Sequence, residues 1–334
     1  MKQYNICMVG SGYMARKHCL ALRNSPLAQF HTLVVSSPNH QKGMEFQNEF
    51  RFRKVTGNYT EPLQDKEIDI VFICTPNQLH AQQTIESLRY GKDVFCEKPL
   101  AYTIDEFQEI EKTIKNTRQI LQVGMNCRFR EQYSIPYDYA KDNLLGALQY
   151  IRGTYIVNVM QSVQNREKPW VLNYPTGVLP WLHGGAIHTI DLLQWIGGDI
   201  KRVFTLATGT ELGQEFIYDT FNIQFEYSLG AIGEMVTSSA AKRPDNFSLE
   251  IWGKNGSIID QFLYLQKEER LETTEIKVTQ EKIDLLLQFE NMIQAIERDK
   301  QPRNSFNEAK KNFALIKAIE KSVATNKAVD VTYL

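Results

Sequence analysis

The sequence lacks both a surplus of charge and a long hydrophobic run. Its 334 residues contain 38 Lys and Arg against 39 Asp and Glu, a formal net charge of −1. This balance excludes the basic excess with which proteins attract nucleic acid or an anionic membrane. No stretch approaches the ~20 apolar residues that a membrane span requires, and the apolar run near the N-terminus is too short for a signal peptide. We therefore expect a cytoplasmic protein that binds neither nucleic acid nor membrane.

Cysteine is also scarce. The five residues are odd in number, lack the spacing of metal ligands and lie mostly in apolar runs: Cys7, Cys19, Cys74, Cys96 and Cys127. Free cysteine behaves as a small hydrophobic residue. We predict buried, reduced thiols without chemistry, and we predict no metal site.

The length favours two domains. In the first third of the chain, short apolar runs alternate with helical patterns, which indicates βαβ units and a doubly wound parallel sheet. Thr103 and Glu106 have the spacing of a capping box at a helix start. The expected strands are 5–9, 32–36, 68–74, 93–96 and 120–123, and the expected first domain is 1–124.

A different periodicity begins after this point. Phe221, Ile223 and Phe225 alternate with polar residues, which predicts a mostly antiparallel, open-faced sheet with one buried side in an α+β domain over 125–334. Ser305 and Glu308 form a second capping-box pattern before the last helix. Further expected elements are strands at 147–159, 203–207, 231–236, 247–252 and 257–262, and helices at 131–144 and about 305–325.

A glycine-rich turn follows the first expected strand and opens a helical pattern. It has the form GxGxxA and comprises Gly10, Ser11, Gly12, Tyr13, Met14 and Ala15. Gly10 permits the tight turn, Gly12 lets the backbone approach a pyrophosphate, and Ala15 allows close helix packing. The helix N-terminus then offers N–H groups to the phosphates. We predict a site for NAD(P); the alternative is a glycine turn that binds nothing.

The residues expected to hold the adenosine ribose are uncharged. An NAD site usually places an acid roughly 20 residues after the glycines, but Ser36 and Ser37 occupy this region and Lys42 lies close by. A 2′-phosphate would meet no repulsion, so NADP is slightly favoured over NAD. The alternative is that the serines only begin a turn before Pro38.

Five motifs stand in the order and spacing of a known family: GSGYMARKH, CTPNQLH, GKDVFCEKPLA, VGMNCRF and IHTIDLLQWIGG. The chain resembles the Gfo/Idh/MocA family of glucose-fructose oxidoreductases and inositol dehydrogenases from its N-terminus to its final helix. The resemblance implies a Rossmann domain, a second domain with a large open sheet, and a last helix that packs back on the first domain. It also implies NAD(P)-linked oxidation or reduction of a sugar or polyol, and a homodimer or homotetramer formed through the open sheet.

The resemblance also assigns residues at two strand ends, where ligands of doubly wound sheets bind. The expected cofactor contacts there are Thr75, Pro76, Asn77, His80, Glu97 and Lys98. Lys98 would face the nicotinamide, bond the reacting oxygen and lower the pKa of a neighbouring base; the alternative is a surface lysine that closes a strand. His18 and His80 match positions near the cofactor, where helix capping or packing is an equal alternative.

Removal of hydride from an alcohol also requires a base for the hydroxyl proton. His188 matches the family base, and Asp191 follows three residues later, where its carboxylate could orient the imidazole from the same helical face. A structural histidine is the alternative. His31 and His40 are expected on the surface.

One position departs from the family pattern. Many members carry Asp four residues before this histidine, whereas Gly184 stands here. His183 or Asp191 would have to compensate, or the activity is altered. Arg128 and Trp170 match family positions near the substrate, although both could serve packing. Arg128, Trp170 and His183 are therefore assigned only as second-rank substrate residues.

The function that these residues favour is an NAD(P)-dependent oxidoreductase that transfers a hydride between a nicotinamide and a sugar, nucleotide-sugar or polyol. Two alternatives stand beside it: a non-enzymatic NAD(P)-binding regulator, and a glycosidase that oxidises its substrate transiently with tightly held NAD. Lys98 and His188 favour the redox enzyme, whereas Gly184 keeps the regulator in question. No motif identifies the substrate or the direction of reaction.

Overall fold

The computed structural model describes residues 2–35, 40–159, 174–175, 178–209, 218–278 and 283–333. The chain divides into two compact units: 1–126 with 282–309, and 127–281 with 310–334. The expected second domain, 125–334, differs from this division mainly in 282–309, which belong to the first unit. This return is explained by helix α9 (Asp284–Arg298), whose residues Phe289, Met292 and Ile293 join the core that also contains residues of helix α1 (Tyr13–Leu22).

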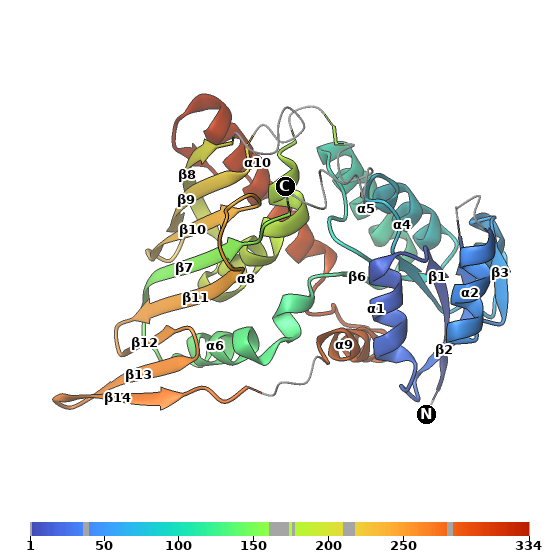
Figure 1. The fold of residues 1–334 in the computed structure, drawn as a ribbon, viewed down its shortest axis with the longest axis horizontal. Coiled ribbons are helices and arrows are strands. Elements are labelled where there is room, and N and C mark those ends of the chain that lie inside the picture. Colours follow the sequence, from blue (N-terminus) through green and yellow to red (C-terminus); the bar gives the residue numbers. More distant parts are fainter. Residues whose placement is uncertain are drawn as a thin grey trace. The chain divides into compact units, whose positions relative to one another are not determined.

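The first unit is built on a parallel sheet. Within its described residues, six strands follow the order β3-β2-β1-β4-β5-β6 (Figure 1). The order reverses between β1 and β4, which is where ligands of doubly wound sheets bind. The strands are β1 (Tyr4–Val9), β2 (Ala28–Val34), β3 (Lys54–Thr56), β4 (Ile70–Ile73), β5 (Asp93–Cys96) and β6 (Leu121–Val123).

Helices connect these strands. Besides α1 they are α2 (His40–Phe50), α3 (Thr60–Gln64), the 3-10 helix η1 (Asn77–Leu79), α4 (His80–Arg89) and α5 (Ile104–Thr117). All four residues of β4 are buried, as expected for a parallel strand covered on both faces. At the start of α5, Thr103 accepts a hydrogen bond from the Glu106 N–H, and the Glu106 carboxylate accepts one from the Thr103 N–H. The predicted capping box is confirmed.

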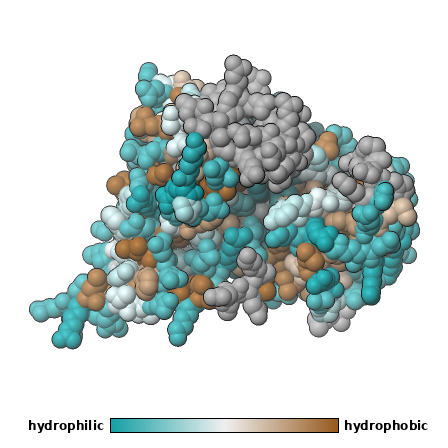
Figure 2. All heavy atoms as spheres, in the orientation of Figure 1, coloured by the Kyte–Doolittle hydropathy of each residue, from teal (hydrophilic) through white to brown (hydrophobic). Residues whose placement is uncertain are grey.

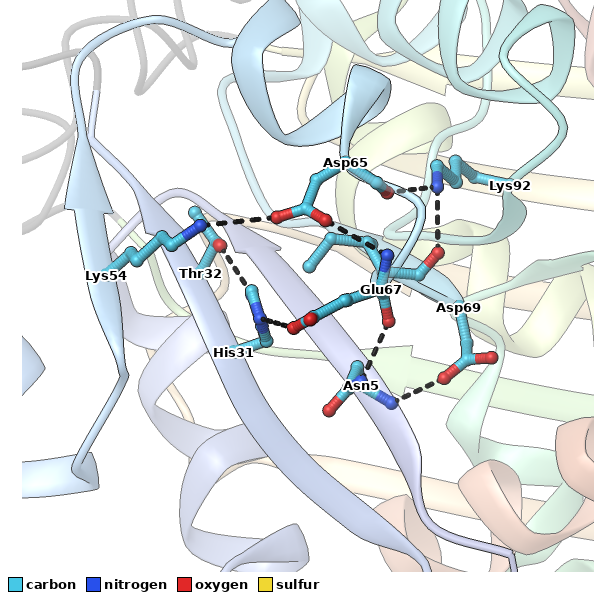
Figure 3. Close-up of polar contacts among 9 residues, drawn as sticks. Asn5, His31, Thr32, Lys54, Asp65, Glu67, Asp69 and Lys92 are labelled. Carbon is cyan, nitrogen blue, oxygen red and sulfur yellow. Dashed lines mark hydrogen bonds and ion pairs between the residues drawn. The ribbon is translucent and has the colours of Figure 1, made fainter.

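A polar cluster lies before the start of β4 (Figure 3). The Lys92 ammonium donates to the carbonyl oxygens of Asp65 and Ile68 at 2.6 and 2.9 Å. His31 lies with Nδ1 2.9 Å from the Thr32 hydroxyl and Nε2 3.1 Å from Glu67. His31 is only 1% exposed, so its prediction as a surface residue is wrong: strand β2 turns the ring inward, where polar partners satisfy it.

The second unit contains a mixed sheet. Within its described residues, nine strands follow the order β14-β13-β12-β11-β7-β10-β9-β8-β15, in which only the β7–β10 pair is parallel (Figure 1). The strands are β7 (Leu148–Ile156), β8 (Ile200–Thr208), β9 (Thr220–Tyr227), β10 (Ile232–Ser238), β11 (Asn246–Gly253), β12 (Gly256–Ile259), β13 (Phe262–Lys267), β14 (Arg270–Glu275) and β15 (Val329–Asp330).

Helices cover one face of this sheet. They include α6 (Glu131–Lys141), the π-helical turn η4 (Leu182–Ala186), α8 (Ile187–Gly197) and α10 (Phe306–Thr325). The short 3-10 helix η2 (Asn126–Phe129) stands where the chain passes from the first unit to the second. Helix α8 approaches β7 so closely that a Cβ at Gly153 would lie 2.5 Å from Thr189 Cγ2. None of the helices in the described ranges is long and apolar enough to cross a membrane.

The two faces of the mixed sheet differ in burial. Phe221, Ile223 and Phe225 are buried, so the predicted alternation along β9 is confirmed. Several apolar side chains of the sheet remain exposed, including Leu206 and Ile232 at 56% and 57%. In the view of Figure 2, apolar and polar side chains are interspersed over the described surface.

Candidate functional site

The glycine-rich turn joins β1 to α1 at the carboxyl end of the parallel sheet. Gly10 has φ +105°, and a Cβ at this position would lie 2.5 Å from the Cys74 carbonyl oxygen. Only glycine combines this backbone conformation with this close approach. The Gly10 N–H donates to the Val34 carbonyl oxygen at 2.8 Å. The turn is therefore held between the ends of β2 and β4.

The start of α1 has the properties of a phosphate site. Gly12 is its N-cap residue, and a Cβ built there would meet no described atom within 4 Å. The first turn reads Tyr13, Met14, Ala15 and Arg16, so no carboxylate competes for its N–H groups. Such groups, together with the helix dipole, bind anions. Ala15 is fully buried against the core, and the arrangement fits the pyrophosphate of a dinucleotide.

Three predicted site residues lie outside the described residues: Ser36, Ser37 and Trp170. They remain predictions. Ser11 and Met14 are half-buried, and Tyr13 is 64% exposed beside Gly12.

Two loops follow the ends of β4 and β5. In the first, the Thr75 hydroxyl donates to Gln83 at 2.6 Å, and Asn77, next to Pro76, donates from its amide to the Tyr102 hydroxyl at 3.0 Å. Tyr102 lies in the second loop, between β5 and α5, so this contact joins the two loops. The sequence did not single out Tyr102.

His80 lies between the same two loops. Its Nδ1 is 2.7 Å from the Pro99 carbonyl oxygen, and its Nε2 is 2.9 Å from the Thr75 carbonyl oxygen. The side chain is 1% exposed. Both ring nitrogens thus face backbone carbonyls, which favours the packing alternative, and a contact of His80 with the cofactor remains a prediction.

Glu97 and Lys98 follow β5 directly. The Glu97 carboxylate is buried and lies 2.8 Å from His18 Nε2 on α1. A Cβ at Gly124 would lie 2.9 to 3.1 Å from the carboxylate atoms, so the glycine leaves space for them. Lys98 is half-buried and precedes a cis peptide bond to Pro99. The pair of Glu97 and His18 thus connects α1 to the residue beside Lys98.

In the second unit, His188 lies in the first turn of α8. It is half-buried, and its ring centroid is 6.4 Å from that of Tyr155 on β7. The helix places it one residue before Thr189, which packs against Gly153 of the same strand. His188 is therefore presented from a helix that is held tightly on the sheet.

Asp191 is held by Arg128 and Asn312. Its Oδ2 accepts from Arg128 Nε at 2.8 Å, and its Oδ1 accepts from Arg128 Nη2 at 2.7 Å and from Asn312 Nδ2 at 2.6 Å. Both carboxylate oxygens thus accept from Arg128 or Asn312, and none of these contacts involves His188, the neighbour that it could orient. The bidentate geometry of a guanidinium explains this choice. Arg128 is 1% exposed and anchors α8 through Asp191; its expected place near the substrate remains a prediction.

His183 also has a structural partner. Its Nε2 lies 3.1 Å from Glu320 on α10, and the same carboxylate accepts from the Leu179 N–H and from Lys317. Burial raises the pKa of Glu320, but the hydrogen bond and charge of His183, with smaller effects of Lys317 and Leu179, bring it below its ordinary value. His183, at 1% exposure, joins η4 to α10.

Position 184 adjoins a hydroxyl. A Cβ at Gly184 would lie 3.6 Å from the Tyr174 hydroxyl oxygen, a normal contact distance. Tyr174, Asn312 and Glu320 are residues that sequence reasoning missed. No local pattern marks the last two, because they meet Asp191 and His183 from 121 and 137 positions away.

A parallel sheet of order 3-2-1-4-5-6, with an open glycine-rich helix start at its switch point, defines a dinucleotide-binding protein. Comparison with known proteins agrees. Residues 4–125 match the model of an oxidoreductase family with an NAD-binding Rossmann fold, and residues 138–259 match the GFO/IDH/MocA C-terminal domain. The chain belongs to the Gfo/Idh/MocA family of oxidoreductases.

The relatives have low sequence identity to this chain but align with it over most of its length. Levoglucosan dehydrogenase of Pseudarthrobacter phenanthrenivorans is 26% identical over 298 residues, which cover 80% of this chain and 76% of that protein. Inositol 2-dehydrogenase/D-chiro-inositol 3-dehydrogenase of Lacticaseibacillus casei is 23% identical over 257 residues, covering 75% and 70%. A solved levoglucosan dehydrogenase in complex with NADH and levoglucosan has the same fold, with a TM-score of 0.84 at 21% identity over 100% of both chains.

Proposed function

We propose that this protein is an NAD(P)-dependent oxidoreductase that transfers a hydride between the nicotinamide and a CH–OH carbon of a sugar, nucleotide-sugar or polyol. The observation that carries the proposal is the strand-end arrangement of the first unit. There the open N-terminus of α1 and the half-buried Lys98 follow β1 and β5, and Glu97 links them through His18. Family membership and the names of the relatives support the substrate class.

The α1 N–H groups, Lys98 and His188 would have separate roles in this reaction. The α1 N–H groups would hold the cofactor pyrophosphate, and the bound nicotinamide would supply or accept the hydride. The Lys98 ammonium would donate a hydrogen bond to the substrate oxygen that changes between hydroxyl and carbonyl, which stabilises negative charge as it develops. His188 would accept the hydroxyl proton in oxidation and return it in reduction.

Asp191 enters this proposal as a positioning residue. It ties α8 to Arg128 and to Asn312 on α10, and the helix in turn carries His188. Orientation of a catalytic group within a fraction of an ångström can change a rate substantially. The Tyr174 hydroxyl beside Gly184 is the polar group that we place where a carboxylate was expected.

Finer assignments complete the proposal. We favour NADP slightly over NAD because Ser36 and Ser37 carry no charge to repel a 2′-phosphate. The exposed apolar side chains of the mixed sheet, such as Leu206, Ile232 and Trp252, support a homodimer or homotetramer formed through that face. The five free thiols are compatible with a cytoplasmic protein.

The test is a panel of sugars, sugar nucleotides and polyols incubated with purified protein and either NAD or NADP, with nicotinamide absorbance as the readout. We expect turnover of at least one substrate, and loss of that turnover in Lys98→Met but not in Lys54→Met, whose side chain is 59% exposed at β3. Binding of cofactor without any turnover would favour the regulator. Cofactor that stays bound through purification and is not consumed while a glycoside is cleaved would favour the glycosidase.

A further inference from the structure

His80 bridges two loops that are distant in sequence. The ring begins α4 and is 1% exposed, with one nitrogen 2.7 Å from the Pro99 carbonyl oxygen and the other 2.9 Å from the Thr75 carbonyl oxygen. Thr75 belongs to the loop after β4, and Pro99 to the loop after β5. The side chain therefore spans the gap between adjacent strand ends.

The chemistry of the bridge suits histidine. A carbonyl oxygen only accepts hydrogen bonds, so the ring must donate: a neutral imidazole donates to one of the two oxygens and an imidazolium to both. Burial brings the pKa of His80 below its ordinary value; the two carbonyls and Glu97 raise it by less, and Lys98 lowers it further. The neutral ring therefore donates a hydrogen bond to one of the two carbonyl oxygens and lies beside the other. His80 and Lys98 also lie close enough for each to affect the charge of the other.

Both neighbours of Lys98 are held by other elements. Glu97 is bound by His18 of α1 at 2.8 Å, and Pro99 is bound by His80 of α4. A second contact, from the Asn77 amide to the Tyr102 hydroxyl, joins the same two loops. The backbone that carries Lys98 is thus tied on each side to a different helix.

We propose that His80 is a positioning residue that places Lys98 for the reaction by holding the loops after β4 and β5 together. The inference rests on the proposed role of Lys98. It takes up the packing alternative for His80, because the two ring nitrogens lie 2.7 and 2.9 Å from backbone carbonyl oxygens. If His80 only packed the start of α4, its substitution would lower stability but would change neither the reactivity of the Lys98 amine nor its position in the site.

The first test needs no substrate. Purified full-length protein is treated with a trace of acetic anhydride, and acetylation of Lys98 is measured by mass spectrometry against the other lysines. In His80→Asn the released loop should expose the half-buried amine, so its acetylation rate should rise roughly 3- to 10-fold, the range set by loss of one or two hydrogen bonds. An unchanged rate in a folded variant would overturn the proposal.

His31→Asn is the matched control. His31 is as buried as His80 and has both nitrogens within hydrogen-bonding distance of polar partners, but it lies in the cluster before β4. It should lower stability without changing Lys98 acetylation. An equal rise in both variants would indicate general loosening of the unit and would contradict a specific role for His80.

The second test is kinetic. With a substrate found in the panel above, His80→Asn should lower kcat about 10-fold and leave the cofactor Kd unchanged, since a small misplacement of a catalytic group is costly. In a Lys98→Met background the same substitution should have no further effect on kcat, because the two residues would act through one contact. A persisting loss, or a change confined to cofactor Kd, would overturn the proposal.

The outcomes separate the two proposals. If no substrate is turned over, the proposed function fails, whereas acetylation still decides whether His80 positions Lys98. If His80→Asn does not fold, Tyr102→Phe removes the hydroxyl that accepts from Asn77 and should raise Lys98 acetylation roughly 2-fold. No rise in that variant would contradict positioning by the joined loops.

Discussion

The buried pair of Arg128 and Asp191 makes a prediction about stability. Asp191→Asn preserves the shape of the side chain and removes its charge. The guanidinium then keeps its positive charge at 2% side-chain exposure without the carboxylate that now accepts from it at 2.7 and 2.8 Å. Loss of one partner from a buried ion pair costs about 3–5 kcal/mol. We expect the second unit to lose stability by this amount.

Tryptophan fluorescence can measure this loss selectively, because all four tryptophans lie within residues 127–281: Trp170, Trp181, Trp195 and Trp252. The ring of Trp195 has its centroid 5.2 Å from the Arg128 guanidinium carbon. With a urea m-value of about 2 kcal/mol/M, the unfolding midpoint should fall by roughly 1.5–2.5 M.

Asp199→Asn is the matched control. Asp199 pairs with Lys311 at 2.7 Å in the same unit, but the two side chains are 46% and 42% exposed. Such a pair contributes at most about 1 kcal/mol, so its midpoint should change little. If Asp191→Asn kept the wild-type midpoint but shifted the acidic limb of the pH–rate profile, the carboxylate would act on His188, and our reasoning would be refuted.

Three further predictions concern the site and its surroundings. Lys98→Ala should lower kcat at least ~100-fold while cofactor Kd changes little, since the ammonium acts on the reacting oxygen; near-normal turnover would remove it from the mechanism. Ser36→Asp should weaken NADP far more than NAD, because a carboxylate repels the 2′-phosphate; equal losses in parallel titrations would place the ribose elsewhere. The folded-state pKa of Glu320 lies below its ordinary 4.5, so its contribution to stability should be complete above that pH and disappear as the pH falls through the folded-state value. Urea midpoints of the wild type and Glu320→Gln across this range test it, and a difference that did not change with pH would contradict it.

Local structure could be predicted from the sequence where the interacting residues are close along the chain. The capping box of Thr103 and Glu106 depends on a spacing of three residues, and the glycine turn depends on the backbone freedom of Gly10; both occur as predicted. The alternation along β9 likewise follows from the two-residue period of a strand.

Predictions failed where a side chain had a choice of partner. Asp191 lies three residues from His188, which made that pairing the natural expectation, but Arg128 offers two donors in matching geometry from another part of the chain. The burial of His31 was missed because Glu67, its partner 36 positions away, is brought to it only when β2 lies beside the loop before β4.

The sequence by itself determined the family, the doubly wound sheet and the place of the glycine-rich turn, because these depend on short motifs and on the periodicity of apolar residues. Only the tertiary structure decided which polar groups meet: His80 with two carbonyls, Asp191 with Arg128 and Asn312, and His183 with Glu320. The physical reason is that a buried polar group must find a partner wherever the fold brings one. The distance between such partners along the chain leaves no local pattern from which to predict them.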